Sequence, residues 1–492
     1  MPGRSAPEWR RSALVAALLL VAVAVRWRTF GNPVVGFDEQ FYLVVGDRMV
    51  HGDLPFVTIF DRKPIGLFLI YAGARLLGGE GTIEAQMVAL GFVWATALLI
   101  WRFARRSGGE FGGLAAAIAY LVWLVFVEGE GGQAPVFFNL PMVAAALLVE
   151  RAWRRGNEGV AVATASGVAA MLLVGIAIQI KYTALFEGIF FGLALLQASR
   201  QAGAAPARLA GQATAWVAAA LAPTALAWGW YAAIGHGREY LFANFVSMWG
   251  KHGDRWQVSV EGLAAILGIM SPFFLMAFWP RRFPSPAAPS PPTARFARGW
   301  FVAALLGMLA MRSFPTPQYA APMLVPAVIA SAERLRDSRG WRIAAVAGLL
   351  VAALIGQLVL AKLERNKGGA REAAAVAAAA RPTHGGCLYV YDGYPALYRL
   401  TQSCLPTRFI FPGHLNMANE DSAAALGVDP EAEEARILAA RPETIVLDDR
   451  PFEEGNLKTY AMVRATLARD YHLVLAERTG KRYRLVYRRN GM

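Results

Sequence analysis

Long apolar segments dominate the chain up to about residue 360. Runs of roughly 20 mostly apolar residues, some slightly shorter, occur about eleven times, and this is the length that a helix needs to cross a bilayer. Their centres lie near Leu19, Val93, Ala119, Ala144, Ala169, Gly192, Leu221, Gly268, Ala304, Val325 and Val351. The pattern predicts a polytopic α-helical membrane protein.

Arginine clusters occupy every second connection between these segments. Because cytoplasmic loops carry an excess of Lys and Arg, these connections are predicted to face the cytoplasm. The clusters are Arg102, Arg105 and Arg106; Arg151, Arg154 and Arg155; Arg200 and Arg208; Arg281, Arg282, Arg295 and Arg298; and Arg334, Arg336, Arg339 and Arg342. An odd number of spans then places the basic N-terminus inside and the C-terminus outside. We expect the first apolar run, 12–25, to be a retained anchor rather than a cleaved signal peptide.

One apolar segment, 65–77, breaks this scheme because it has only about 13 residues, too few to cross a bilayer. Counting it as a span would invert every later loop against its arginine content. We therefore predict an interfacial or re-entrant helix at this position.

The pattern changes after residue 362. An Ala-rich helical stretch, 363–380, is followed by short β-like runs that alternate with helices. The expected strands are 387–392, 407–411, 444–449 and 483–489, and the expected helices are 396–401, 430–440 and 457–470. This alternation predicts a small external α/β domain over 363–492, after a membrane domain over 1–362. Cys387 and Cys404 both lie in it, and either a disulfide or two buried thiols fits the sequence.

Composition supports the membrane class. Of the 492 residues, 56% are hydrophobic and only 17% are charged, which is too apolar for an ordinary soluble enzyme of this length. The net charge of +14 does not indicate nucleic-acid binding, because many of the arginines lie in the short clusters between apolar runs. His236 and His252 lack Cys or paired carboxylates nearby. No cofactor is therefore predicted, and a divalent metal is left as an open alternative.

The predicted external loop after the first span, 31–64, holds the densest group of mixed charges near a membrane face. Asp38 and Glu39 begin an amphipathic stretch, so the acidic pair is expected on a helix at the membrane surface. A carboxylate beside the cations Arg62 and Lys63 suits displacement at a sugar anomeric carbon with a lipid-linked phosphate as leaving group. The carboxylate would take the acceptor proton, and the cations would stabilise the phosphate. The alternative for any one of these charged residues is that it has no chemical role and lies in a loop exposed to water.

Four motifs in this chain carry a family resemblance. FDEQFY followed by DRKPIG resembles the first external loop of the GT-C membrane glycosyltransferases, in particular the protein O-mannosyltransferase and lipid A aminoarabinose transferase group. In the same order along the chain, EGEGGQAP, IQIKYTAL and SFPTPQYAAPMLVP resemble that group's acidic external turn, its lysine-bearing span end and its late tyrosine and proline motif. The resemblance covers roughly residues 12–362 and implies a GT-C fold.

The resemblance also implies roles for single residues. Asp38 is the catalytic base, and Glu39 supports it or contacts the acceptor. The donor phosphate is held by Lys63 together with Arg62, Lys181 and Arg312, and the candidate acceptor or donor contacts are Tyr42, Glu128, Glu130 and Tyr319. Two positions depart from the group's pattern: Ile65 stands where a second proline is frequent, and Gln318 where a basic residue is usual. The second departure weakens the assignment of contacts near Tyr319.

These observations predict an inverting membrane glycosyltransferase. It would move a sugar from a polyprenyl-phosphate donor to a hydroxyl of an envelope lipid, glycan or protein, at the inner membrane and with its C-terminal domain in the periplasm. Its partners would be the lipid-linked donor, the acceptor and membrane lipids, with no nucleic acid. Two alternatives stay open: a transporter or flippase of a lipid-linked or small solute, and a binding protein without chemistry. No residue type singles out the sugar or the acceptor.

Overall fold

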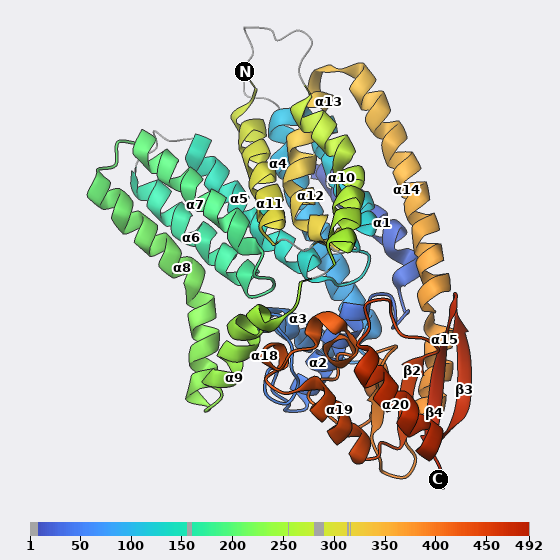
Figure 1. Ribbon diagram of the computed structural model, residues 1–492. Helices are drawn as coiled ribbons and strands as arrows, with labels where there is room; N and C mark the ends of the chain where they lie inside the picture. Colours follow the sequence, from blue (N-terminus) through green and yellow to red (C-terminus); the bar gives the residue numbers. More distant parts are fainter. Residues whose placement is uncertain are drawn as a thin grey trace. The chain divides into compact units, whose positions relative to one another are not determined.

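The computed structural model describes residues 8–154, 160–253, 255–279, 290–311, 314 and 316–491. The described chain forms two compact units, each assembled from segments that are distant in the sequence. Unit 1 comprises the described residues within 1–28, 87–225 and 256–359, and unit 2 those within 29–86, 226–255 and 360–492 (Figure 1).

Unit 1 is helical in its described part. Its short 3₁₀ turns are η1 (Trp27–Thr29), η2 (Leu124–Val127) and η5 (Pro317–Ala320). Its helices, some of which run on into unit 2, are α1 (Glu8–Arg26), α4 (Thr82–Trp123), α5 (Ala134–Arg154), α6 (Val160–Ile178), α7 (Ala184–Gln201), α8 (Pro206–Ala233), α10 (Trp256–Phe278), α11 (Pro292–Ala310), α12 (Ala321–Ser331), α13 (Arg334–Asp337) and α14 (Arg339–Lys367).

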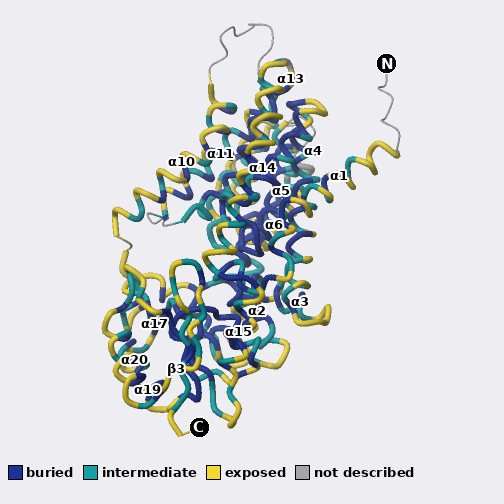
Figure 2. The backbone as a smooth tube through the Cα atoms, turned by 90° about the vertical axis from the view of Figure 1, so that its right-hand side faces the viewer, coloured by how far each residue is buried: buried dark blue, intermediate teal, exposed yellow. Residues whose placement is uncertain are grey.

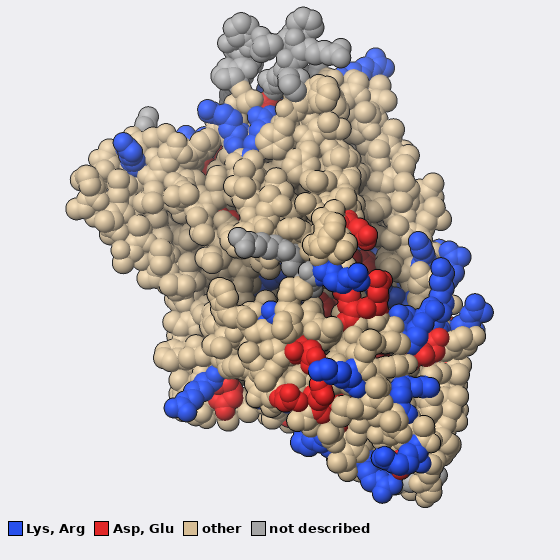
Figure 3. Space-filling model, viewed as in Figure 1, with Lys and Arg blue, Asp and Glu red and all other residues tan. Residues whose placement is uncertain are grey.

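Six helical stretches among the described residues are long and apolar enough to cross a membrane: 9–29, 82–127, 134–154, 206–233, 256–278 and 339–380. The predicted number of about eleven spans is therefore not confirmed, although every predicted span centre lies in a helix. Much of the surface of α1 and α10 is exposed (Figure 2), and charged side chains are sparse over the long helices of unit 1 (Figure 3). Exposed apolar helices of this kind are expected to face lipid.

Helix α4 contains a reversal at Gly109, whose backbone φ of 68° and ψ of −172° are not helical. A Cβ atom at Gly113 would lie 2.8 Å from the carbonyl oxygen of Trp101, and in a straight helix two residues twelve positions apart could not come so close. Two predicted span centres, Val93 and Ala119, therefore lie on two helical halves that meet at this reversal. The connection predicted at the Arg102 cluster is helical, and the chain turns three residues beyond Arg106.

Unit 2 begins with two packed helices, α2 (Phe37–Val50) and α3 (Ile65–Arg75). A Cβ at Gly46 of α2 would lie 2.6 Å from the Tyr71 carbonyl carbon, so the missing side chain allows the two backbones to approach closely. The ring centroids of Tyr42 and Tyr71 are 5.6 Å apart across the same contact. With 11 residues, α3 is too short to span a bilayer, as its sequence predicts.

The rest of unit 2 carries a four-stranded sheet in the order β1-β2-β4-β3. Strands β1 and β2 are parallel and buried along their full length, and β4 pairs with β2 and β3 antiparallel. The strands are β1 (Leu388–Val390), β2 (Thr444–Asp448), β3 (Tyr471–Thr479) and β4 (Arg482–Arg489); the helical elements are α9 (Gly237–Leu241), η3 (Phe242–Val246), η4 (Ser247–Gly250), α15 (Ala370–Ala380), α16 (Leu397–Leu400), α17 (Gly413–Asn416), η6 (Ala418–Glu420), α18 (Ala423–Leu426), α19 (Pro430–Ala439) and α20 (Leu457–Asp470).

One predicted strand in this region is wrong, and one observed strand was not predicted. Residues 407–411 form no strand, because the one backbone hydrogen bond they share with a distant segment, from Phe60 N to Arg408 O at 2.9 Å, makes no ladder. Residues 471–479 form the unpredicted β3, which follows α20 with no turn residues between them. A strand that starts directly at a helix end lacks the Gly, Pro or Asn boundary that identifies strands in a sequence.

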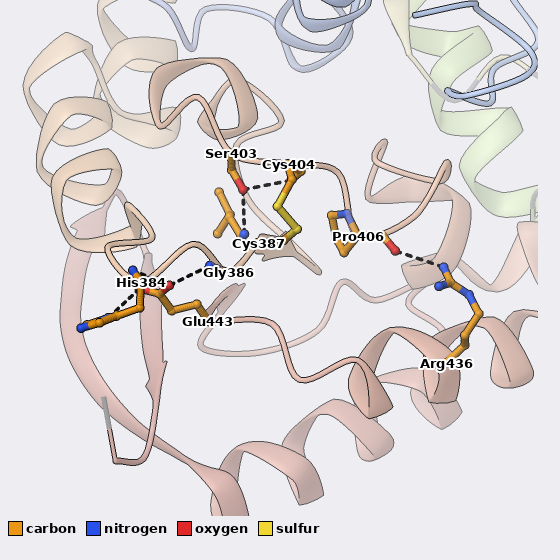
Figure 4. Close-up of a disulfide and its surroundings, with 9 residues drawn as sticks. His384, Gly386, Cys387, Ser403, Cys404, Pro406, Arg436 and Glu443 are labelled. Carbon is orange, nitrogen blue, oxygen red and sulfur yellow. Dashed lines mark hydrogen bonds and ion pairs between the residues drawn. A yellow bond between two sulfur atoms is a disulfide. The ribbon is translucent and has the colours of Figure 1, made fainter.

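Cys387 and Cys404 form a disulfide, with Cα atoms 5.1 Å apart (Figure 4). Beside it, the Glu443 carboxylate accepts hydrogen bonds from the backbone N–H groups of Thr383 at 2.6 Å, His384 at 3.0 Å and Gly386 at 3.2 Å. The disulfide and this carboxylate together hold the chain that enters β1.

Candidate functional site

The acidic pair of the first loop lies at the N-terminus of α2. Asp38 and Glu39 are in the first turn of the helix, where the unsatisfied N–H groups and the helix dipole favour negative charge. The Glu39 carboxylate folds back over Gly36, the N-cap residue, into space that a Cβ at Gly36 would fill. The sequence Gly-Phe-Asp-Glu therefore forms a helix start that holds two carboxylates close together.

Tyr42 connects Asp38 with Lys63. One turn after Asp38, the Tyr42 hydroxyl donates a hydrogen bond to Asp38 Oδ2 at 3.2 Å, and the ring is almost fully buried. The Lys63 Nζ lies 5.8 Å from the centroid of the same ring, within cation–π range. Burial, followed by the charge of Asp38, raises the pKa of Tyr42 well above its usual value, so this hydroxyl stays a proton donor. The predicted base and the predicted phosphate cation thus share one buried neighbour.

Asp61 fixes the backbone that presents Lys63. Its carboxylate Oδ1 accepts from the N–H of Arg62 at 2.5 Å and from the N–H of Lys63 at 3.3 Å. This is the turn that Asp side chains form with the residues directly after them. The side chains of Arg62 and Lys63 consequently leave the chain in defined directions.

The Arg62 guanidinium is hydrogen-bonded to three other residues of unit 2. Its guanidinium donates to Ser247 Oγ at 3.0 Å, to Glu420 Oε1 at 2.8 Å and to the Ala425 carbonyl at 2.8 Å. Glu420 also pairs with Lys251 at 2.8 Å, and the side chains of both Arg62 and Glu420 are 7% exposed. A guanidinium held on three sides in this way ties the first loop to the C-terminal residues, rather than leaving donors for a phosphate.

Lys181, another predicted phosphate-binding residue, lies in unit 1. Lys181 follows α6, and its Nζ lies 5.4 Å from the ring centroid of Tyr319 in η5. The two residues line a small cavity of about 20 Å³ together with Thr183, Phe186, Glu187, Ala304, Gly307, Met308, Met311 and Pro322. The lysine motif and the late tyrosine motif, which are far apart in the sequence, therefore meet in unit 1.

The acidic turn after η2 is held by an arginine that the sequence did not single out. Arg26, at the end of α1, is 3% exposed and donates to the carbonyls of Gly129 at 2.7 Å and of Gly131. Glu130 is buried, and Glu128 is half-buried with a left-handed backbone φ of 55°. Arg26 directly follows the predicted apolar run 12–25, and nothing in the sequence around it points to residues 129–131.

Three other residues considered in the sequence, Arg312, His236 and His252, do not join the two clusters around Tyr42 and Tyr319 in the described part of the chain. Arg312 lies outside the described residues. His236 contacts Glu239 at 3.4 Å, whereas His252 lies near the Asp421 carbonyl at 3.3 Å. Within the described residues, no group of three or more His, Cys, Asp and Glu side chains could hold a metal ion.

His414 is a buried histidine behind the loop of Arg62. Its ring lies 5.1 Å from that of Phe60 and 5.3 Å from that of Phe411, and within the described chain neither ring nitrogen has a hydrogen-bond partner. Burial, and next the charge of Arg62, lower the pKa of His414 to about 3. His414 is therefore neutral in the folded protein at any physiological pH.

Replacing His414 with Phe is expected to make the protein more resistant to acid. Between pH 6.5 and about 3 the unfolded chain binds a proton at His414 that the folded chain refuses, so stability falls as the pH decreases through this range. The unfolding temperatures of H414F and of the unchanged protein should be similar at pH 7.5 and separate at pH 4.5, in favour of H414F. His472→Phe, at an exposed position on β3, is the control. Equal acid sensitivity of H414F and the unchanged protein would contradict the assignment.

Comparisons with known proteins identify the fold. No protein-family model matches the sequence, and no curated protein matches it. Among solved structures, the crystal structure of ArnT from Cupriavidus metallidurans bound to undecaprenyl phosphate is similar over 98% of this chain and 98% of that chain, with a TM-score of 0.63 and 15% identity. This similarity confirms the predicted GT-C membrane fold.

Two further structures are less similar. The oligosaccharyltransferase AglB from Archaeoglobus fulgidus, in complex with an inhibitory peptide and a dolichol-phosphate, aligns with 97% of this chain and 74% of its own, at a TM-score of 0.44 and 12% identity. The arabinosyltransferase EmbB from Mycobacterium smegmatis aligns with 89% of this chain and 41% of its own, at a TM-score of 0.40 and 15% identity.

Proposed function

We propose that this chain, which has the GT-C fold, is a membrane glycosyltransferase that moves a sugar from a polyprenyl-phosphate donor to an acceptor hydroxyl. The observation that carries the proposal is the Asp38, Tyr42 and Lys63 cluster, which combines a carboxylate and a cation around one buried phenol. The undecaprenyl phosphate bound to ArnT, which has the same fold, supports the kind of donor.

Asp38 is the proposed base. As the acceptor oxygen attacks the anomeric carbon, the Asp38 carboxylate takes the hydroxyl proton and the bond from that carbon to the phosphate oxygen breaks. Attack opposite to the leaving phosphate inverts the anomeric configuration. The hydrogen bond from Tyr42 orients the Asp38 carboxylate, which is proposed to face the acceptor.

Lys63 is the proposed phosphate residue of the first loop. The leaving polyprenyl phosphate gains negative charge as the sugar departs, and a positioned ammonium group stabilises this charge. Arg62 is not part of this proposal, because Ser247, Glu420 and Ala425 hold its guanidinium. Roles for Lys181, Arg312, Glu128, Glu130 and Tyr319 rest on the resemblance of their motifs.

The proposed setting is a bacterial inner membrane, with the Asp38 loop and residues 363–492 on the periplasmic side. The arginine clusters support this orientation. The disulfide between Cys387 and Cys404 supports it too, since disulfides persist in oxidising compartments. Acceptors of the envelope would approach from that side.

A Lys63→Gln variant tests the phosphate assignment. Purified protein in liposomes is supplied with a polyprenyl-phosphate sugar, and release of polyprenyl phosphate is measured. Loss of a charge-assisted hydrogen bond should lower kcat/KM for the donor by about 10- to 100-fold. Lys63→Arg should recover part of the loss, and Lys458→Gln, at an exposed pair with Glu431, should change nothing.

Three results would count against the proposal. Unchanged donor use by K63Q would remove Lys63 from the phosphate site. Movement of a solute across the liposome membrane, without release of polyprenyl phosphate from any donor tried, would favour a transporter instead. A GT-C fold that keeps neither activity would indicate a binding protein.

A further inference from the structure

A polar cavity lies at the C-terminal end of α2, the end away from Asp38. It measures about 640 Å³ and is built from four segments of unit 2: the last turns of α2, the end of α3 with the loop after it, the residue that follows α15, and the chain around α16. Its lining residues are Val44, Asp47, Arg48, His51, Arg75, Gly79, Glu80, Arg381, Tyr398, Arg399, Leu400, Gln402 and Ser403. We call it the arginine cavity.

The arginine cavity is separate from the proposed catalytic cluster. Asp38 is in the first turn of α2 and Arg48 is in the last, which at the helical rise per residue is a separation of about 15 Å. Asp38, Tyr42 and Lys63 do not line the cavity. The function proposed above therefore leaves it unexplained.

Four arginines and two carboxylates line the cavity, and Asp53, the partner of Arg48, brings the carboxylates to three, so a small excess of positive charge remains. Arg48 pairs with Asp53 at 2.6 Å, and Arg75 pairs with Asp47 at 2.7 Å. Glu80, the second lining carboxylate, is exposed.

Arg381 and Arg399 form no ion pair within the described residues. Arg381 donates to the Leu400 carbonyl at 3.2 Å, and Arg399 donates to the Glu80 carbonyl and to Thr82 Oγ1 at 2.8 Å. Burial has the largest effect on Arg399 and lowers its pKa, and Arg75 acts in the same direction, whereas the charges of Asp47, Glu80 and Glu84 raise it. The half-buried guanidinium is bonded to a carbonyl and a hydroxyl but directly to no carboxylate, so these charges offset the cost of its burial only in part and a directly bound anion would reduce it further.

The loop after α3 is shaped around Arg75. Gly78, Gly79 and Gly81 have φ angles of +91°, +62° and +87°, which side chains other than Gly rarely adopt. Arg75 Nη1 donates to the carbonyls of Gly78 at 3.3 Å and Gly79 at 3.0 Å, and a Cβ at Gly81 would lie 2.6 Å from Arg75 Cδ. The glycines thus let the backbone wrap around this guanidinium and hold it at the cavity.

The opposite wall is braced by the disulfide. Ser403 Oγ accepts from the Leu388 N–H at 2.7 Å and donates to the Cys404 carbonyl at 2.9 Å, and Cys404 is bonded to Cys387 (Figure 4). The short helix α16, which carries Arg399, therefore ends in a segment that is fixed to β1. A wall held this firmly suits a binding site that is formed before its ligand arrives.

We propose that the arginine cavity binds a phosphate group of an anionic ligand, at a site distinct from that of the donor phosphate. A guanidinium group can pair with a phosphate through two parallel hydrogen bonds. Several guanidinium groups around one cavity favour an anion with two negative charges. The volume admits a whole phosphorylated head group. Such a group is either a lipid head group or a soluble phosphorylated compound, and phosphate is the chemistry that they share.

Binding of inorganic phosphate to the full-length protein tests this site. In nanodiscs of phosphatidylcholine, titration calorimetry should detect binding that becomes about tenfold or more weaker in Arg399→Gln and in Arg381→Gln. Arg381 makes one hydrogen bond with its guanidinium, so R381Q answers the question if R399Q fails to fold. Arg255→Gln, at an exposed pair with Glu453, is the matched control and should bind phosphate unchanged.

Two additional arms separate the sources and the sites. Nanodiscs containing phosphatidylglycerol should weaken phosphate binding in the unchanged protein if lipid head groups occupy the cavity, and should leave it unchanged if the ligand is soluble. Lys63→Gln should keep the arginine-dependent phosphate binding. The test of the arginine cavity is therefore independent of the test of the proposed transferase. No phosphate binding, or binding that R381Q and R399Q leave intact, would overturn the proposal.

Discussion

Replacing Asp38 with Asn is expected to lower the rate of sugar transfer by about 10²- to 10⁴-fold, the range associated with loss of a general base. The amide cannot take the proton of the acceptor hydroxyl, but its oxygen can still accept the hydrogen bond that Tyr42 donates to Asp38 at 3.2 Å. The start of α2 should therefore fold as before. The measurement is release of polyprenyl phosphate under single-turnover conditions, with donor binding followed separately.

Two other variants isolate the charge of Asp38. Glu39→Gln should reduce transfer less than Asp38→Asn, because Glu39 is proposed only to support the base. Asp470→Asn changes a surface carboxylate paired with Arg469 and should leave transfer unaltered. If D38N transfers sugar at the unchanged rate while E39Q does not, Glu39 is the base and the proposed assignment is reversed.

Removal of Arg62 should have the largest effect on stability. In Arg62→Met, the Glu420 carboxylate keeps Lys251 at 2.8 Å but loses the guanidinium that shares its buried site. Removing one partner of a buried ion pair costs about 3–5 kcal/mol, because the other charge stays buried. Chemical unfolding of the purified protein should show a loss of this size.

The double variant R62M/E420Q provides the internal check. Once the second charge is neutral, much of the loss seen in R62M should be recovered, and the difference between single and double variants measures the coupling. Arg255→Met, at an exposed pair with Glu453, should change stability little. If R62M unfolds like the unchanged protein but requires far more donor, Arg62 is a phosphate residue after all.

The fold was predictable where the sequence pattern is long and regular. Apolar runs gave helices at every predicted centre, and the loop motifs identified the GT-C fold. The connection after Val93 was predicted at the Arg102 cluster, whereas the chain turns at Gly109, because arginine content does not identify the residue at which a helix ends. The strand at 471–479 was missed because α20 runs into it directly, so that no turn residue marks the boundary.

Less of the candidate site was predictable, because side-chain partners come from distant segments. Asp38 and Lys63 stood out as charges in one loop, but their common contact with Tyr42 depends on how α2 packs against the chain before α3. Nothing near Arg62 in the sequence points to Glu420, which is 358 residues away. The arginine cavity likewise joins Arg75 and Arg399 from segments that share no pattern.

Unit 2 contains both the first loop of the chain and its last described residues. During synthesis, the contacts of the first loop can therefore form only after the C-terminal residues have been made. The Asp38 loop leaves the ribosome early, but Phe37 and Phe41 pack on Phe411, and Arg62 meets Glu420, only when more than 300 further residues have been made. Contacts between such distant segments form late and slowly. Until then the loop is without its surroundings, so a chain whose synthesis stops early would contain the proposed base but not its finished site.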